Sequence, residues 1–360
     1  MFRLTGLFLF LTLTLSSYAQ TNKEKAMNNV KQALILQDHG KPDEAIKLLE
    51  DARHFDAETS TVSYELAIAY YSKGEYEKAR VVLDSLTKHK DAFGNIYQLL
   101  GNCYDKQGNT EKAIATYLDG VTKFPNTGEL YLEMGTMFLS RKEYNPAIGW
   151  YEKGIEMNPG LASNYYWAAK IYCNSDNAVW GMLYGEIFLL LERDTKRTDE
   201  VSKLLYDTYK KDIRFPRDSS FAVRFSSRIM PGPGDTSNGK KSKIPFAKSV
   251  YEPTLMLALL SEKSVDLNSL CRVRKYFIES WFRNLNYQKY PNVLFDFQYR
   301  ALKAGHIDAY NHYVLYKGDE TACNKWISAN KSKWENFMKW FTKNQLLLDT
   351  NYRFIRKQYD

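Results

Sequence analysis

The chain is poor in the residues and motifs that most often carry chemistry. Its 360 residues include only five histidines and four cysteines. None of the common serine-hydrolase, zinc-protease or cysteine-protease signatures occurs in it. After the N-terminal segment, no apolar run reaches the length of about 20 residues that a membrane-spanning helix needs. We therefore predict a protein that is neither an enzyme nor membrane-spanning, and we assign it no catalytic residue, metal ligand or cofactor.

The first nineteen residues predict a signal for export. A positive charge at Arg3 precedes an apolar run over residues 4–15, and Ser17 and Ala19 are small residues of the kind that signal peptidase requires. We expect cleavage between Ala19 and Gln20, which would make the mature protein periplasmic or secreted. No cysteine follows the cleavage point, which argues against a bacterial lipid anchor.

A periodic pattern runs through the first half of the chain. Four alanines recur every 34 residues: Ala45, Ala79, Ala113 and Ala147. A glycine stands five positions before each of the first three, where a left-handed residue would end one helix before the next begins. A spacing this regular indicates an internal repeat.

The third and fourth repeats carry the fullest pattern. The third has Tyr97, Leu100, Gly101 and Tyr104, followed by Ala113, Tyr117 and Pro125. The fourth has Tyr131, Met134, Gly135 and Phe138, followed by Ala147, Tyr151 and Pro159. In these residues the chain resembles the tetratricopeptide repeat (TPR) family, whose unit of 34 residues is a helix–turn–helix. The resemblance implies a mainly α fold, a TPR α-solenoid with a right-handed superhelix, built from units at residues 26–59, 60–93, 94–127 and 128–161.

Residues 162–210 predict a degraded fifth unit and a helix that caps the solenoid. Residues 165–172 keep the pattern of a first helix, but Gly181 replaces the expected alanine, and residues 188–191 are unusually apolar. Because a terminal unit must have its last face covered, we expect this one to be buried against the domain that follows, so that the two form one rigid body.

Residues 211–360 predict a basic domain in which we recognise no family. Lysine and arginine outnumber aspartate and glutamate here, while the rest of the chain is acidic overall. The patterns predict mostly helices, with a strand at residues 219–227 that could pair with residues 244–253 in a β-hairpin. Between the two, proline, glycine and serine predict a flexible loop at residues 231–243.

Two helical patterns of this domain are specific. Five residues form one apolar stripe along a helix: Leu270, Phe277, Ile278, Trp281 and Leu285. Residues 291–318 predict two helices hinged at Gly305, where the sequence weakly resembles the turn inside a repeat.

Four cysteines in an exported chain raise the question of disulfides. Cys103 and Cys173 lie about two repeats apart, which is too far for a bond whose Cα atoms lie about 4.4–6.8 Å apart. Cys271 and Cys323 could pair, although a buried free thiol is the state that we favour for each.

Two segments could hide chemistry. Residues 234–241 approach a phosphate-binding loop, but Lys241 takes the place of the hydroxyl residue that would hold magnesium. His306, Asp308 and His312 are ligand-like, but on one helix the two histidines face different ways. Zinc needs three or four converging ligands. An exported hydrolase or metal-dependent enzyme that uses Asp308 and His312 is the alternative hypothesis.

The TPR resemblance implies a binding groove along the first helices of the units, because stacked helix pairs leave a concave surface there. The residues predicted to line it are Tyr64, Ile68, Tyr71, Gln98, Asn102, Asp105, Leu132, Thr136, Tyr166 and Lys170. Their polar and aromatic groups suit a peptide or a segment of another protein. Some TPR domains bind a chain-terminal carboxylate through two lysines and two asparagines. Only Asn102 matches that clamp, and Gln98 stands where a lysine would be.

These patterns predict an exported, non-enzymatic TPR protein that mediates protein–protein binding in the bacterial cell envelope. Export argues against nucleic acid as a partner. The basic C-terminal domain could instead meet an anionic envelope polymer or the acidic surface of a partner. A purely structural component, whose solenoid bridges larger assemblies, is a third hypothesis.

Overall fold

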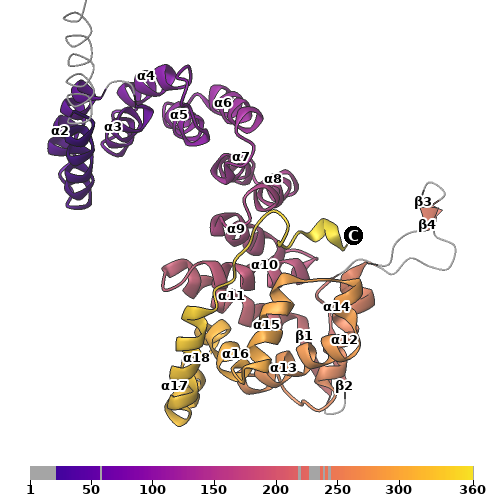
Figure 1. Ribbon diagram of the computed structural model, residues 1–360. Helices are drawn as coiled ribbons and strands as arrows, with labels where there is room; N and C mark the ends of the chain where they lie inside the picture. Colours follow the sequence, from indigo (N-terminus) through magenta and orange to yellow (C-terminus); the bar gives the residue numbers. More distant parts are fainter. Residues whose placement is uncertain are drawn as a thin grey trace, which may run out of the picture. The chain divides into compact units, whose positions relative to one another are not determined.

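The computed structural model describes residues 22–56, 59–217, 220–226, 236–237, 240–241 and 245–359. The fold is mainly α-helical, as predicted (Figure 1). The predicted signal peptide and most of the predicted loop at residues 231–243 lie outside the described residues. The chain divides into two compact units, Met1–Met134 and Gly135–Asp360, which we describe separately.

The first unit is a run of helix pairs. Residues 22–38 are helical. The helices that follow are α2 (Pro42–Phe55), α3 (Ser60–Ser72), α4 (Tyr76–Leu86), α5 (Gly94–Lys106), α6 (Thr110–Lys123) and the start of α7 (Gly128–Ser140). These bounds confirm the predicted alternation of first and second helices through the first three units. Each pair is joined by a short turn.

The turns between paired helices rest on a left-handed residue. In the third unit Gly108 has φ +78°, and its N–H donates to the carbonyl of Asp105 at 2.9 Å. The side chain of Asn109 then caps α6 by accepting from the N–H of Lys112 at 3.3 Å. In the fourth repeat the equivalent residue is Lys142, which belongs to the second compact unit. It has φ +62° and the same pattern of backbone hydrogen bonds. Lysine tolerates this conformation at some cost, because its Cβ crowds the backbone there.

Small residues let the two helices of one repeat approach closely. A Cβ on Gly101 of α5 would lie 2.1 Å from Cε1 of Tyr117 on α6, so the glycine leaves space for that ring. In the fourth repeat, Gly135 stands in the same relation to Tyr151, with a separation of 2.4 Å. Both tyrosine rings are buried. The glycine and tyrosine of the repeat pattern therefore form one packing unit.

The second unit continues with repeat-like helix pairs and then changes character. Its helices α8 (Tyr144–Met157), α9 (Ala162–Cys173), α10 (Ala178–Leu191) and α11 (Lys196–Asp212) come first. The later elements are a π-helix at Ala247–Tyr251, α12 (Glu252–Leu259), α13 (Leu267–Arg283), α14 (Asn286–Lys289), α15 (Val293–Lys303), α16 (Ile307–Val314), a 3-10 turn at Tyr316–Gly318, α17 (Glu320–Ala329), α18 (Lys331–Lys343) and a 3-10 turn at Arg356–Gln358. Residues 162–210 and 211–360, which we predicted to pack against each other, lie in one compact unit.

The β-hairpin forms with a different partner from the one predicted. Strand β2 (Ser220–Val223) pairs antiparallel with β1 (Ile213–Arg217), which directly precedes it. Residues 247–259, which cover most of the predicted partner strand, are helical instead. Adjacent strands need only a short turn, so the local pairing costs less loop entropy than the predicted one. Two short strands, β3 (Thr236–Ser237) and β4 (Lys240–Lys241), also pair.

Helix α10 is the centre of the second unit. Every residue from Ala178 to Leu190 is buried, which accounts for a helix that is apolar all round. Among the later helices, α13 buries the predicted stripe with one exception. Leu285 lies beyond the end of α13 at φ +58° and is 52% exposed, so its inclusion was wrong. The predicted hinge is confirmed, with Gly305 at φ +75° between α15 and α16.

The C-terminal segment returns to the repeat-like helices of the second unit (Figure 1, yellow). The ring of Phe354 is fully buried and packs edge-on against Tyr184 of α10 at 5.1 Å. Arg356 donates through Nε to Oε1 of Glu152 on α8 at 2.9 Å, where Glu152 also accepts from the hydroxyl of Tyr172. This contact joins residues that are 204 positions apart in the sequence.

Candidate functional site

The first unit places seven of the predicted groove residues on its first helices. Helix α3 carries Tyr64, Ile68 and Tyr71, α5 carries Gln98, Asn102 and Asp105, and α7 carries Leu132. We call these seven residues the first-helix face. Asp105 is exposed and the other six are half-buried, so the face is neither core nor fully solvated surface.

Hydrogen bonds connect α5 to α7 across this face. Oε1 of Glu133 accepts from Nε2 of Gln98 at 2.7 Å and from Nδ2 of Asn102 at 3.1 Å. Oδ1 of Asn102 in turn accepts from the hydroxyl of Tyr117. Asn102 is therefore held by two partners and faces Glu133, a residue that the sequence analysis did not select. The sequence could have indicated Glu133, because it follows the selected residue Leu132 directly and lies one helical turn after Glu129 on the same helix.

The electrostatic environment shows that alternate repeats share this face. Burial, together with the smaller effects of the charges of Glu65 and of Glu129 on α7, raises the pKa of Tyr64 on α3 to about 12. Burial likewise raises the pKa of Tyr71 to about 12, with smaller contributions from acidic neighbours that include Glu133. Both tyrosines of α3 thus lie within the field of carboxylates from the repeat after next.

The first-helix face is bordered by acidic groups. Glu65, Asp105, Glu129 and Glu133 form no ion pair with another residue that the structure describes. Burial raises the pKa of Glu65 above its ordinary value, which shows that this carboxylate is partly removed from water. The face and its border therefore combine two tyrosines, two amides and four carboxylates that no cation among the described residues pairs with.

The second unit holds the other three predicted groove residues, and it does not leave them all open. Thr136 of α7 lies near the hydroxyl of Tyr151, at 3.4 Å. Tyr166 of α9 is only 6% exposed, so its prediction as a groove residue was wrong. Its hydroxyl donates to Glu200 of α11 at 2.5 Å, and Nζ of Lys170 pairs with the same carboxylate at 2.7 Å.

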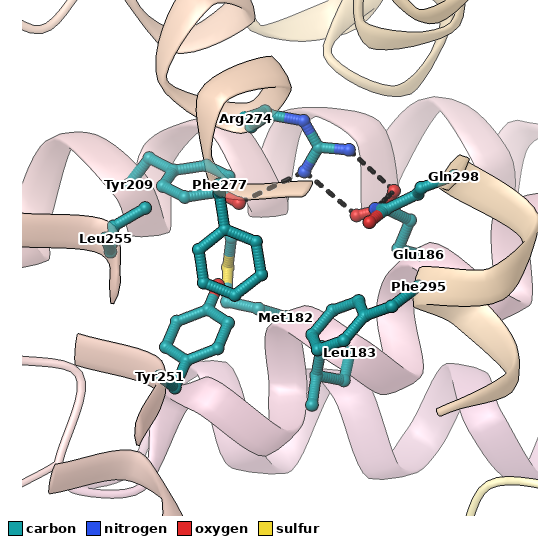
Figure 2. A pocket seen from close by; sticks show the side chains of 10 residues that line it. All are labelled: Met182, Leu183, Glu186, Tyr209, Tyr251, Leu255, Arg274, Phe277, Phe295 and Gln298. Atoms are coloured by element: carbon teal, nitrogen blue, oxygen red, sulfur yellow. Dashed lines mark hydrogen bonds and ion pairs between the residues drawn. The ribbon is translucent and has the colours of Figure 1, made fainter. Parts of the chain in front are cut away.

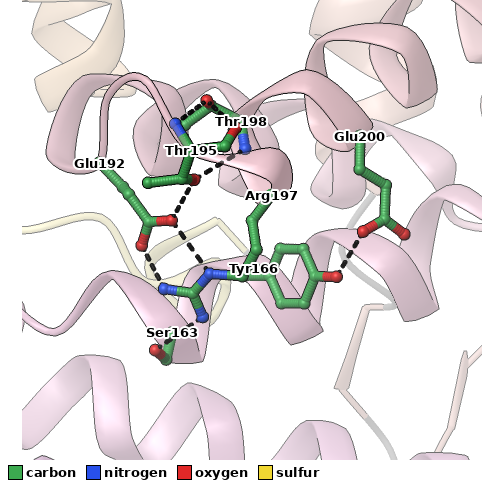
Figure 3. A network of polar contacts seen from close by, with 7 residues as sticks. All are labelled: Ser163, Tyr166, Glu192, Thr195, Arg197, Thr198 and Glu200. Atoms are coloured by element: carbon green, nitrogen blue, oxygen red, sulfur yellow. Dashed lines mark hydrogen bonds and ion pairs between the residues drawn. The ribbon is translucent and has the colours of Figure 1, made fainter. Parts of the chain in front are cut away.

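Figure 3 shows the contacts through which α11 packs on α9, the first helix of the predicted fifth unit. The guanidinium of Arg197 forms an ion pair with Glu192 at the end of α10 and donates to Oγ of Ser163 at 3.0 Å. Thr195 and Thr198 form a reciprocal capping box that fixes the start of α11. On α9, the face that the sequence pattern predicts as part of the groove is therefore covered by α11 of the same chain.

A second polar cluster lies in the core of the second unit (Figure 2). Glu186 of α10 forms a bidentate ion pair with Arg274 of α13, at 2.6 and 2.9 Å. Gln298 and Tyr310 also donate to Glu186, and Arg274 donates to the hydroxyl of Tyr209 at 3.0 Å. The carboxylate and the guanidinium are both nearly inaccessible, with 4% and 5% exposure.

This cluster has no room for a substrate. The cavity beside it has a volume of about 20 Å³, which is enough for one water molecule. Its other walls are apolar or aromatic, including Met182, Phe277 and Phe295. A paired and enclosed charge of this kind contributes to the specificity of packing, and we give it no catalytic role.

The residues of the alternative hypothesis are not arranged for catalysis. His312 is 2% exposed and stacks on Trp326 with ring centroids 4.0 Å apart. Its Nδ1 lies 2.7 Å from the backbone carbonyl of Asp308, not from the carboxylate, which points toward Lys275 at 3.8 Å. Burial lowers the pKa of His312 below its ordinary value. Burial raises the pKa of the neighbouring Cys271 thiol, so this group stays protonated and is a poor nucleophile.

Three further observations bear on the predicted chemistry. All four cysteines are free and buried. In the part of the chain that the structure describes, no three histidine, cysteine, aspartate or glutamate side chains converge as metal ligands would. Among those same residues, none forms a helix with the length and apolar character that crossing a membrane requires.

Comparison with known families identifies the repeats. Residues 36–93 match one tetratricopeptide repeat model, and residues 94–122 match another. Residues 36–122 are therefore tetratricopeptide repeats, as predicted, and no family is found for the C-terminal half.

Individual proteins resemble the chain more remotely. An uncharacterized protein of Haemophilus influenzae is 26% identical over 110 residues, which cover 31% of this chain and 59% of the relative, so the chain spans about three fifths of that relative's length. A Pseudomonas aeruginosa structure, solved for the functional characterization of pilF, matches at 16% identity and a TM-score of 0.44 over 53% of this chain and 86% of that one. A thermophilic TPR protein of Thermus thermophilus matches at 17% identity and a TM-score of 0.42 over 50% of this chain and 98% of that one.

Proposed function

We propose that this chain is an exported, non-enzymatic TPR protein that binds a segment of another protein on the first-helix face of its first unit. The observation that carries the proposal is the convergence of half-buried tyrosines, amides and carboxylates from three successive first helices. TPR proteins bind peptides or proteins through stacked helix pairs. The predicted signal peptide supports export, and the cell envelope is the place where we expect the partner.

The charge of the face selects the chemistry of the partner. Four carboxylates that form no ion pair within the described part of the chain would attract a segment that carries lysine or arginine, and Tyr64 and Tyr71 offer ring surface to its side-chain stems. The amides of Gln98 and Asn102 already donate to Glu133, so they would orient that carboxylate and leave its remaining lone pairs for the partner. An anionic envelope polymer as a ligand of the basic C-terminal part stays a separate prediction.

The test is photo-crosslinking in the native cell. A photoreactive amino acid replaces Ile68 on the first-helix face, and a matched control replaces Val81 of α4, which is 56% exposed in the same unit. We expect a discrete crosslinked protein from position 68 and none from position 81, with lysine or arginine in the crosslinked peptide identified by mass spectrometry. Equal products from both positions, or a product from position 81 alone, would contradict the proposed face.

A further inference from the structure

A separate hollow of about 320 Å³ lies in the second unit, between the C-terminal end of α10, the start of α11, the end of α16 and α18. Its size is within the range of small-ligand pockets, which is about 300–1,000 Å³. Three aromatic rings line it, those of Tyr313, Tyr316 and Trp334. None of the residues of the first-helix face contributes to it, and we call it the aromatic pocket.

The charges that line the aromatic pocket leave one carboxylate unbalanced. Nζ of Lys317 lies 3.2 Å from Asp199 and 3.2 Å from Glu320, so its positive charge is already paired. Asp194 makes no hydrogen bond or ion pair with another described residue. Arg193 precedes it, but its guanidinium stacks on the ring of Phe341 at 3.8 Å and is not part of the lining. The uncompensated group in the pocket is therefore an anion.

The backbone fixes Asp194 in this place. Its φ of +56° is in the left-handed region, where aspartate and asparagine are tolerated better than most residues. Thr195, the next residue, caps α11 and its side chain donates to Glu192 at 2.6 Å. Burial raises the pKa of Tyr313 to about 12, and of the two neighbouring charges Arg193 lowers it and Asp194 raises it. The phenol ring thus stays neutral at physiological pH.

The same geometry favours a cation over an anion. The first backbone N–H groups of α11 could hold an anion only if they were free, but that of Thr198 donates to Oγ1 of Thr195 at 3.2 Å, and that of Asp199 donates to the carbonyl of Thr195 at 3.2 Å. Two carboxylates face the one paired lysine of the lining. Neutral aromatic faces beside a free carboxylate are the arrangement that recognises an organic cation.

We propose that the aromatic pocket binds an alkylammonium or guanidinium group, with Asp194 as its counter-ion and the rings of Tyr313, Tyr316 and Trp334 as its walls. The group can belong to a lysine or arginine side chain of a partner or to a free amine. The two sources share one chemistry, and they differ in whether a peptide backbone is needed for binding.

Isothermal titration calorimetry of the mature chain separates the two sources. The probes are the diamine cadaverine and a blocked pentapeptide with lysine between glycines, and the control is the same pentapeptide with norleucine. Binding of the lysine peptide alone identifies a partner side chain, and equal binding of cadaverine identifies a free amine. Either result supports the pocket, provided that the norleucine peptide does not bind. Absence of binding by both cations at millimolar concentration would overturn the proposal.

Two variants locate the binding. Asp194→Asn removes the charge in a residue that also tolerates left-handed backbone, and Trp334→Leu removes one wall. Each should weaken cation binding by about tenfold, which corresponds to the loss of one favourable cation contact. Asp207→Asn removes a different exposed carboxylate of α11, which pairs with Lys203, and should leave the affinity unchanged. Affinity that is retained by both pocket variants would show that the cation binds elsewhere.

Discussion

Gly101 of the first unit and Glu186 of the second lie at the centres of two differently built cores. Gly101 admits the ring of Tyr117, a neighbour from the same repeat. Glu186 collects donors from α13, α15 and α16, and its partner Arg274 is 88 residues away in the sequence. The repeat core depends on size and local spacing, whereas the second core depends on polar groups that only the folded chain brings together.

The difference matters for function because polar groups that are paired inside the fold stabilise it, whereas unpaired groups at the surface can bind a partner. In the second unit, several carboxylates that lie between helices are paired within the chain, as Glu200 is with Tyr166 and Glu152 with Arg356. On the first-helix face of the first unit, carboxylates are left without a cation among the described residues. Paired groups stabilise the fold, and unpaired ones are available to a partner.

The largest effect is expected from breaking the buried ion pair. Arg274→Met leaves the carboxylate of Glu186 enclosed without its cation, and we expect the second unit to lose about 3–5 kcal/mol of unfolding free energy. All seven tryptophans follow residue 134, so tryptophan fluorescence in a denaturant titration reports this unit alone.

Two controls sharpen this prediction. The double variant Glu186→Met and Arg274→Met removes both charges and should recover most of the lost stability. Lys203→Ala breaks an exposed pair with Asp207 and should change the stability by about 0.5 kcal/mol or less. A loss in Arg274→Met no greater than that in Lys203→Ala would show that the buried pair does not hold this core together.

A smaller effect is expected from crowding the repeat core. Gly101→Ala puts a methyl group where the ring of Tyr117 lies, and we expect the first unit to lose about 1–3 kcal/mol. Far-UV circular dichroism should show an earlier transition while the tryptophan transition keeps its midpoint. The matched control is Gly149→Ala in α8, where an added Cβ meets nothing within 4 Å and the helix should gain about 0.5–1 kcal/mol. Equal effects of the two alanines would refute the packing argument.

The sequence predicted the repeats well because each repeat contacts mainly its neighbours, so a fixed spacing determines which residues meet. The turns at the glycines and the pairing of Gly101 with Tyr117 both follow from that spacing. Lys142 shows the limit of such prediction, since a lysine gives no indication of a left-handed backbone conformation.

The rest of the fold depends on contacts between distant segments, which no local pattern contains. We predicted the wrong partner for β2 because two stretches of the sequence could form a strand beside it, and the one that is nearer in the sequence does so. Tyr166 fits the groove pattern, but α11 covers it, and the sequence does not show where that helix packs. Glu133 was missed because its role depends on two amides from another repeat.

The central claim is that the first-helix face binds a protein segment, and one affinity measurement tests it most directly. The segment identified by crosslinking is titrated, as a synthetic peptide, into the chain with Tyr71→Ala and into the control Val81→Ala. Tyr71 is half-buried on the face and Val81 is exposed on a second helix. We predict that Tyr71→Ala weakens binding about tenfold or more, as loss of an aromatic anchor does, while Val81→Ala binds like the unchanged chain. Equal affinity of the two variants would contradict the account.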